Sequence, residues 1–98
     1  MAPRWHRLSV SLWIYWSLDG VGQAGEEAAD VPAAVRALDI SVERGRRAFD
    51  SDAPWKALKA SADLIRTRML REAPEPLSHG EEWSARTEGV EVRLIPRG

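Results

Sequence analysis

The sequence predicts one small α+β domain over residues 1–98, an antiparallel helical hairpin packed on a sheet of two or three strands. Three observations support this prediction. Apolar residues alternate near both ends of the chain, they recur every three or four residues in its middle, and 98 residues suit a single domain. The expected order of elements is β-α-α-β, extended to β-α-α-β-β if the chain forms a further strand near its C-terminus.

The first expected strand covers residues 8–18, where apolar residues occupy every second position: Leu8, Val10, Leu12, Ile14, Trp16 and Leu18. A second interpretation of residues 1–24 is a signal segment, with Arg4 and Arg7 as its positive flank and residues 22–24 as a cleavage site. Strict alternation favours the strand, because a signal segment does not require it. The run is too short for a membrane span, which takes about 20 apolar residues.

A first helix is expected to begin at Asp30, a favourable N-cap, with Pro32 in its first turn. Its apolar residues lie along one narrow stripe: Val31, Val35, Leu38, Val42 and Phe49. Gly45 lies on the same stripe and is expected to let another helix approach closely. Ile40 lies opposite the stripe and is expected to be exposed.

A second helix is expected after a cap at Ser51 or Asp52, and residues 73–76, which include two prolines, end it. It also has an apolar stripe: Trp55, Leu58, Ala62, Ile65 and Met69. Two such helices joined by a short break predict an antiparallel hairpin whose stripes pack on each other and on the sheet.

The C-terminal part contains a polar loop over residues 77–82 and then a strand over residues 90–95 that Pro96 stops. Residues 83–87 are the optional further strand. The glycine-rich stretch over residues 19–27 is expected to be the most flexible loop. Because a sheet of two or three strands is marginal by itself and the first strand is long, we expect a homodimer formed through the edge of the first strand.

Composition excludes several kinds of site. The chain has no cysteine, so it has no disulfide framework and no thiolate ligand or nucleophile. With only His6 and His79, a histidine-built zinc site would need carboxylates to complete it. A net charge of −1 argues against a generally basic nucleic-acid-binding surface. We therefore expect no metal, no cofactor and no membrane segment. Arginine exceeds lysine 12 to 2, a bias typical of GC-rich genomes, so a bacterial or phage protein of the cytoplasm is expected.

The first strand also suggests where a partner binds. Trp13 and Tyr15 occupy its more polar face together with Arg7. Tryptophan, tyrosine and arginine dominate the energetics of protein interfaces. The sequence therefore predicts a non-enzymatic protein-binding module, such as a regulator, inhibitor or accessory subunit, that uses an open sheet face or edge and binds a protein partner or a second copy.

An alternative is nucleic-acid binding. Residues 44–71 carry a local excess of positive charge, and four cations share an outward sector of the second helix: Lys56, Lys59, Arg66 and Arg71. Such a stripe could neutralise phosphates, with bases stacking on Trp13 and Tyr15. The other interpretation of these cations is an ordinary solvated helix face.

A third hypothesis comes from the order of the elements. A strand, a helical hairpin and then the Trp-containing stretch over residues 82–93 loosely resemble ribosome-dependent RNA-cleaving toxins of toxin–antitoxin pairs. This resemblance implies RNA cleavage, with His79 acting together with Arg86 or Arg93. Those toxins are usually basic and continue into further strands, and this chain departs from them in both respects, so RNA cleavage is kept only as an alternative.

Overall fold

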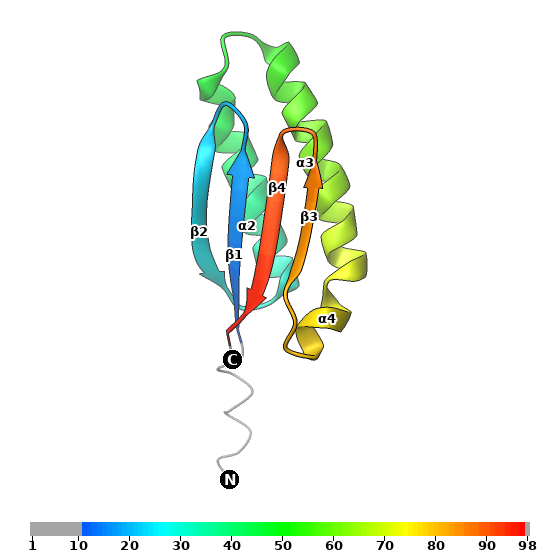
Figure 1. Ribbon diagram of the computed structural model, residues 1–98. Coiled ribbons are helices and arrows are strands. Elements are labelled where there is room, and N and C mark those ends of the chain that lie inside the picture. Colours follow the sequence, from blue (N-terminus) through cyan, green and yellow to red (C-terminus); the bar gives the residue numbers. More distant parts are fainter. Residues whose placement is uncertain (1–10, 98) are drawn as a thin grey trace.

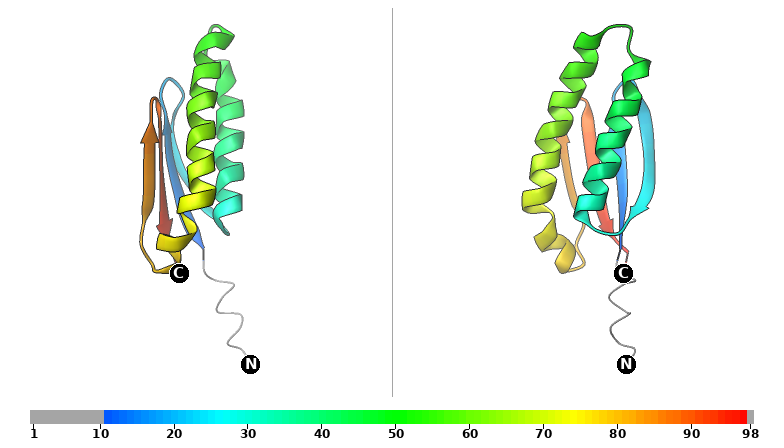
Figure 2. Two further views of the ribbon diagram at one scale, coloured as in Figure 1. Left: turned by 90° about the vertical axis from the view of Figure 1, so that its right-hand side faces the viewer. Right: turned by 180° about the vertical axis from the view of Figure 1, so that it is seen from behind.

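The computed structural model describes residues 11–97. These residues form two layers, an antiparallel sheet and a helical layer on one of its faces (Figures 1 and 2). In chain order the elements are β1 (Leu12–Leu18), β2 (Gly22–Ala28), α2 (Val31–Arg44), the 3₁₀ helix η1 (Gly45–Ala48), α3 (Asp52–Glu72), α4 (Pro74–Ser78), β3 (Trp83–Thr87) and β4 (Val90–Pro96). The order of strands across the sheet is β2-β1-β4-β3. The α+β class is thus confirmed, but two strands precede the helices instead of one.

The additional strand is β2, and the prediction of a flexible loop over residues 19–27 was wrong. A tight turn joins β1 to β2: the Val21 N–H donates to the Leu18 carbonyl at 3.0 Å. Gly20 in this turn has a φ of 80°, a left-handed conformation that glycine adopts without strain. Beyond the turn every β2 residue pairs with β1, although only Ala28 has a buried side chain. Main-chain pairing therefore holds this strand, and hydrophobic periodicity gives no sign of it.

Strand β1 lies in the middle of the sheet. It pairs with β2 on one side and with β4 on the other over residues 12–18. The expectation of a dimer through the edge of this strand was wrong, because neither edge of β1 is free. Residues 8–10 of the expected strand, and residues 1–10 of the alternative signal segment, lie outside the described residues.

The core lies between the sheet and helices α2 and α3, which run side by side (Figure 2). All five apolar residues predicted for the second helix are buried in α3. From the sheet, Ile14, Leu18, Val92 and Leu94 face them and are almost inaccessible to solvent. Asp30 is the N-cap of α2, as predicted: its side chain accepts a hydrogen bond from the Ala33 N–H at 2.9 Å.

The first helix is shorter than its apolar stripe suggested. Helix α2 ends at Arg44, and Gly45 begins the 3₁₀ turn η1. The close neighbour of Gly45 is not another helix but Val21 in the β1–β2 turn, because a Cβ at Gly45 would lie 2.9 Å from Val21 Cγ2. Part of the expected loop over residues 77–82 is also helical, since α4 extends to Ser78.

Candidate functional site

The helices cover one face of the sheet, and no helix or strand within residues 11–97 covers the other face, which we call the open face (Figure 2). On β1, the alternation that sends Ile14 and Leu18 into the core places Trp13, Tyr15 and Ser17 on the open face. The strand registers put eight neighbours on the same face: Gln23, Gly25, Glu27, Ser84, Arg86, Glu91, Arg93 and Ile95. The two interface aromatics predicted within the described residues therefore lie at the centre of this open face, while Arg7 lies outside the described residues.

Trp13 is held in a defined position on the open face. A Cβ at Gly25 would lie only 2.6 Å from Trp13 Nε1, so the indole lies directly over this glycine of β2. The Arg97 guanidinium carbon is 5.3 Å from the centroid of the indole ring, within the range of a cation–π contact. Ile95 is the cross-strand partner of Trp13 on β4. The indole is thus oriented by its neighbours while it remains half-exposed.

Tyr15 is oriented by a polar contact instead. Its hydroxyl donates a hydrogen bond to Gln23 Oε1 on β2. Its ring lies between Gly25 on β2 and Arg93 on β4 in the strand register. Like the Trp13 indole, this side chain is half-exposed and has a fixed direction, which lowers the entropy cost of placing it against a partner.

The β3–β4 half of the open face is charged, but its charges pair with one another. Arg93 Nε donates to Glu82 Oε2 at 2.8 Å, and Arg86 lies 3.6 Å from Glu91. The hydrogen bond from Arg93 lowers the pKa of Glu82, and the same contact raises the pKa of Arg93. At the turn end, a shallow depression of about 270 Å³ is lined by polar groups that include Ser17, Asp19, Arg86 and Glu91.

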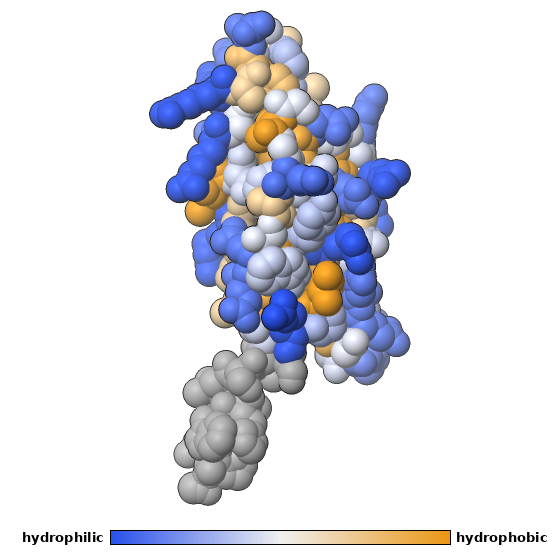
Figure 3. Space-filling view, turned by 60° about the vertical axis from the view of Figure 1, so that its left-hand side comes forward, coloured by the Kyte–Doolittle hydropathy of each residue, from blue (hydrophilic) through white to orange (hydrophobic). Residues whose placement is uncertain are grey.

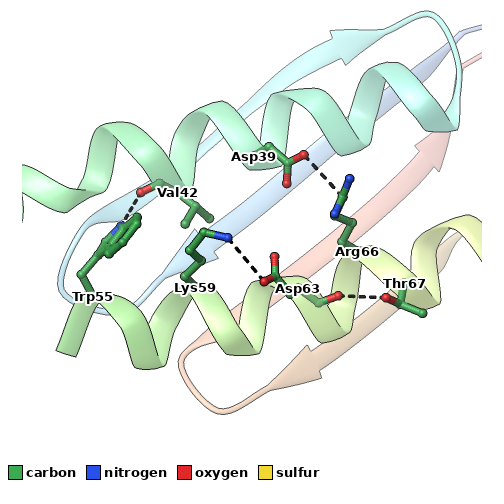
Figure 4. Close-up of polar contacts among 7 residues, drawn as sticks. All are labelled: Asp39, Val42, Trp55, Lys59, Asp63, Arg66 and Thr67. Carbon is green, nitrogen blue, oxygen red and sulfur yellow. Dashed lines mark hydrogen bonds and ion pairs between the residues drawn. The ribbon is translucent and has the colours of Figure 1, made fainter. Parts of the chain in front are cut away.

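The four cations predicted to form a basic stripe all lie on α3, and two of them form ion pairs with aspartates. Lys59 Nζ is 3.4 Å from Asp63, and Arg66 is 3.5 Å from Asp39 on α2 (Figure 4). Both pairs line a small groove between α2 and α3 that also contains Glu43. The ion pairs offset part of the charge that the nucleic-acid hypothesis needs. Of these four cations, Lys56 and Arg71 have no ion-pair partner among residues 11–97.

Within residues 11–97, no hydrogen bond or ion pair joins His79 to either arginine that the RNA-cleavage hypothesis names. His79 is the residue that follows α4, and its side chain makes no hydrogen bond or ion pair with any other residue in the range 11–97. Arg93 binds Glu82 and Arg86 binds Glu91, and the depression lined by Arg86 does not include His79. The geometry therefore gives no support to a histidine–arginine catalytic pair.

Sequence reasoning missed two parts of this surface. Gly25, which supports the Trp13 indole, falls in residues 19–27, which the sequence predicts to be a loop, and Arg97 lies beyond the last predicted strand.

Within residues 11–97 there is no group of three or more histidine, aspartate or glutamate side chains that could hold a metal ion. The helices of that range include none long and apolar enough to cross a membrane. The chain matched no protein-family model, no curated protein and no solved structure.

Proposed function

We propose that this chain is a non-enzymatic protein-binding module whose binding surface is the open face of its sheet. The observation that carries the proposal is the position of Trp13, which is half-exposed on the central strand and fixed between Gly25 and Arg97. A large aromatic side chain kept rigid at the surface is typical of the few residues that dominate a protein interface.

The charge on the open face favours a protein partner over a nucleic acid. Its arginines (Arg86, Arg93 and Arg97) are matched by three glutamates of the same surface: Glu27, Glu82 and Glu91. A surface without net charge has no electrostatic attraction for phosphates, which supply most of the affinity of nucleic-acid binding. The partner that fits is a protein surface with an apolar centre, to cover Trp13 and Ile95, and a polar rim of low net charge.

The surface is also better suited to a protein than to a small ligand. Small molecules usually bind in clefts that bury most of their surface. The depression on this face holds about 270 Å³ and is mainly polar, and it lies at the turn end rather than at Trp13. A broad and nearly flat face is suited to a regulator, an inhibitor or an accessory subunit that acts by covering another protein.

The proposal can be tested with ligands selected against the wild-type chain from a displayed library of protein fragments. Affinities are then measured by calorimetry for wild type, for Trp13→Ser and for Leu64→Ser, a control on the exposed side of α3 where Leu64 is 62% exposed. Loss of a hot-spot residue costs about 2 kcal/mol or more, so Trp13→Ser should weaken binding at least about thirtyfold. Leu64→Ser should bind like wild type.

Two results would count against this function. One is a set of selected ligands that bind Trp13→Ser as well as they bind wild type. The other is binding of single-stranded RNA or duplex DNA that weakens steeply between about 50 and 200 mM salt, which would support the nucleic-acid alternative. In that case Lys56→Glu combined with Arg71→Glu, on α3, should abolish the binding.

A further inference from the structure

Strand β2 forms one edge of the sheet, and no strand within residues 11–97 pairs with the outward-pointing groups of its main chain. The Arg97 N–H donates to the Ser11 carbonyl at 2.8 Å, so the main chain of Ser11 hydrogen-bonds toward the β4 side. Because successive residues of a strand hydrogen-bond to opposite sides, the odd-numbered residues of β1 hydrogen-bond toward β4 and the even-numbered residues toward β2. In the β1–β2 register the even residues of β1 pair with the even residues of β2. The N–H and C=O groups of Gln23, Gly25 and Glu27 therefore point away from the sheet.

This edge lacks most of the features that usually prevent edge pairing. Residues 22–28 contain no proline and no lysine, and they pair with β1 without a bulge. Six of the seven residues are exposed. The opposite edge, β3, is shorter, and only Ser84 and Arg86 point their main-chain groups outward there. Of the two edges, β2 is the one prepared to accept another strand.

A groove runs along the helix side of this edge, between β2 and the outer flank of α2. It holds about 410 Å³, and its α2 wall consists mainly of small or apolar side chains with two arginines: Ala33, Arg36, Ala37, Ile40, Ser41 and Arg44. Ile40 is 51% exposed and is one of three large apolar residues that are exposed within residues 11–97, and it is the one that lies in this groove. Figure 3 views the molecule from this side, where apolar and weakly polar side chains lie among charged ones.

The spacing of the two layers indicates what would fill the groove. Two helices cover four strands, so each helix covers about two strand spacings, close to 9.6 Å. Packed helices lie about 8–10 Å apart. If a second copy added its own β2 to this edge, its α2 would lie one helix spacing from the first α2. Both layers would then continue across the junction, and Ile40 would be buried between the helices.

We propose that two copies of this chain associate through β2, antiparallel and with Gly25 opposite Gly25, to form one eight-stranded sheet. In this register the outward-pointing main-chain groups of Gln23, Gly25 and Glu27 in each copy pair with those of the other copy, which gives about six main-chain hydrogen bonds. Glu27 faces Gln23 of the second copy and Glu26 faces Ala24, so no carboxylates lie directly opposite each other. The two Glu26 side chains are diagonal neighbours, and Arg36 and Arg44 in the same groove offset their charge.

The glycine pair also has a consequence for the open face. Each Gly25 lies under the indole of its own Trp13, so the two indoles would meet above the paired glycines. The two β1 strands would be about 14 Å apart, three strand spacings. The dimer would thus join two aromatic surfaces into one. It does not depend on the function proposed above, because the edge pairs whether or not the open face binds a partner.

The test is the molar mass of the full chain, measured by sedimentation equilibrium from about 1 to 100 μM. Wild type should approach twice 10.9 kDa. Ile40→Lys should raise the dissociation constant at least about tenfold, because it places a charge between the helices. Leu64→Lys, at a leucine of α3 that is 62% exposed, should leave the dissociation constant unchanged. A wild-type chain that stays at 10.9 kDa throughout would overturn the proposal, as would a dimer that Ile40→Lys leaves intact.

A second pair of variants tests the edge itself. Glu27→Pro removes an N–H that points away from β1, so the hairpin should survive while the dimer is lost. Ser84→Pro is the matched control at the β3 edge and should dimerise like wild type. Circular dichroism establishes that each variant is folded. A dimer that Ser84→Pro disrupts and Glu27→Pro does not would place the interface at β3.

The register is tested by cysteine pairing, since the natural chain has no cysteine. Residues 24 and 26 of the two copies would face each other as a non-hydrogen-bonded pair with Cα atoms about 4.5 Å apart, within the range of a disulfide. Ala24→Cys combined with Glu26→Cys should therefore give a covalent dimer on oxidation. Ala24→Cys alone should give little covalent dimer. Equal cross-linking of both variants would contradict the Gly25 register.

Discussion

The β1–β2 hairpin and the β3–β4 hairpin turn in a similar way, each through a glycine with positive φ, 80° at Gly20 and 81° at Gly89. Their turns are joined, because the Asp19 N–H donates to the Gly89 carbonyl at 2.9 Å. Their outer strands differ: β3 buries Trp83 and Ala85, whereas β2 buries only Ala28. Side-chain burial fixes the β3 edge and main-chain pairing fixes the β2 edge, so the two edges should respond differently to mutation.

The largest difference is expected when a side chain is removed from each outer strand. Trp83 is 7% exposed, and its indole N–H donates to Glu72 at 3.3 Å. Trp83→Ala should lower the free energy of unfolding by about 3–5 kcal/mol, because it leaves a cavity under α3. Glu26→Ala on β2 should change it by no more than about 0.5 kcal/mol. Urea denaturation measures both values, and similar losses would show that the two strands are held in the same way.

A smaller effect is expected at Gly25, where β2 packs closely under the Trp13 indole. Gly25→Ala places a methyl group where Trp13 Nε1 is 2.6 Å away, so the indole must move. We expect a loss of about 1–3 kcal/mol, measured by urea denaturation. In a Trp13→Ser background the same substitution should cost much less, because the steric conflict is gone. Equal losses in both backgrounds would mean that the conflict lies elsewhere.

The difference between a strand held by side-chain burial and a strand held by main-chain pairing also explains how much of the fold the sequence predicts. The helices, β3 and β4 have apolar residues at regular spacings because their side chains enter the core. In β2 the order Gly22-Gln23-Ala24-Gly25-Glu26-Glu27-Ala28 has no such spacing, because six of the seven residues are exposed to solvent. The available signal was Gly20, which favours a tight turn after a strand and hence a hairpin.

The open face was predictable only in part. Alternation along β1 predicts that Trp13 and Tyr15 lie on the face opposite Ile14. It does not predict what holds them, because Gly25 and Arg97 reach Trp13 through strand registers between separate segments. The ion pair between Arg66 and Asp39 likewise depends on how α2 and α3 are rotated about their axes, which spacing within one helix does not determine.

The smallest expected effect concerns the ion pairs of the β3–β4 hairpin. Arg93 lowers the pKa of Glu82 below its ordinary value of 4.5 in the folded chain. Because this pKa is lowered on folding, the carboxylate stabilises the fold above pH 4.5, and the contribution is lost as the pH falls through the lower folded value. Both groups are exposed, so the contribution should be small and reduced by salt.

Urea midpoints of wild type and Glu82→Gln test this expectation across pH. At pH 7 the variant should unfold at a slightly lower urea concentration than wild type. The difference should shrink below pH 4.5 and vanish once Glu82 is protonated in both the folded and the unfolded chain. Glu81→Gln is the control, since Glu81 forms no ion pair within residues 11–97. A difference that persists into strong acid would show that Glu82 acts through packing instead of charge.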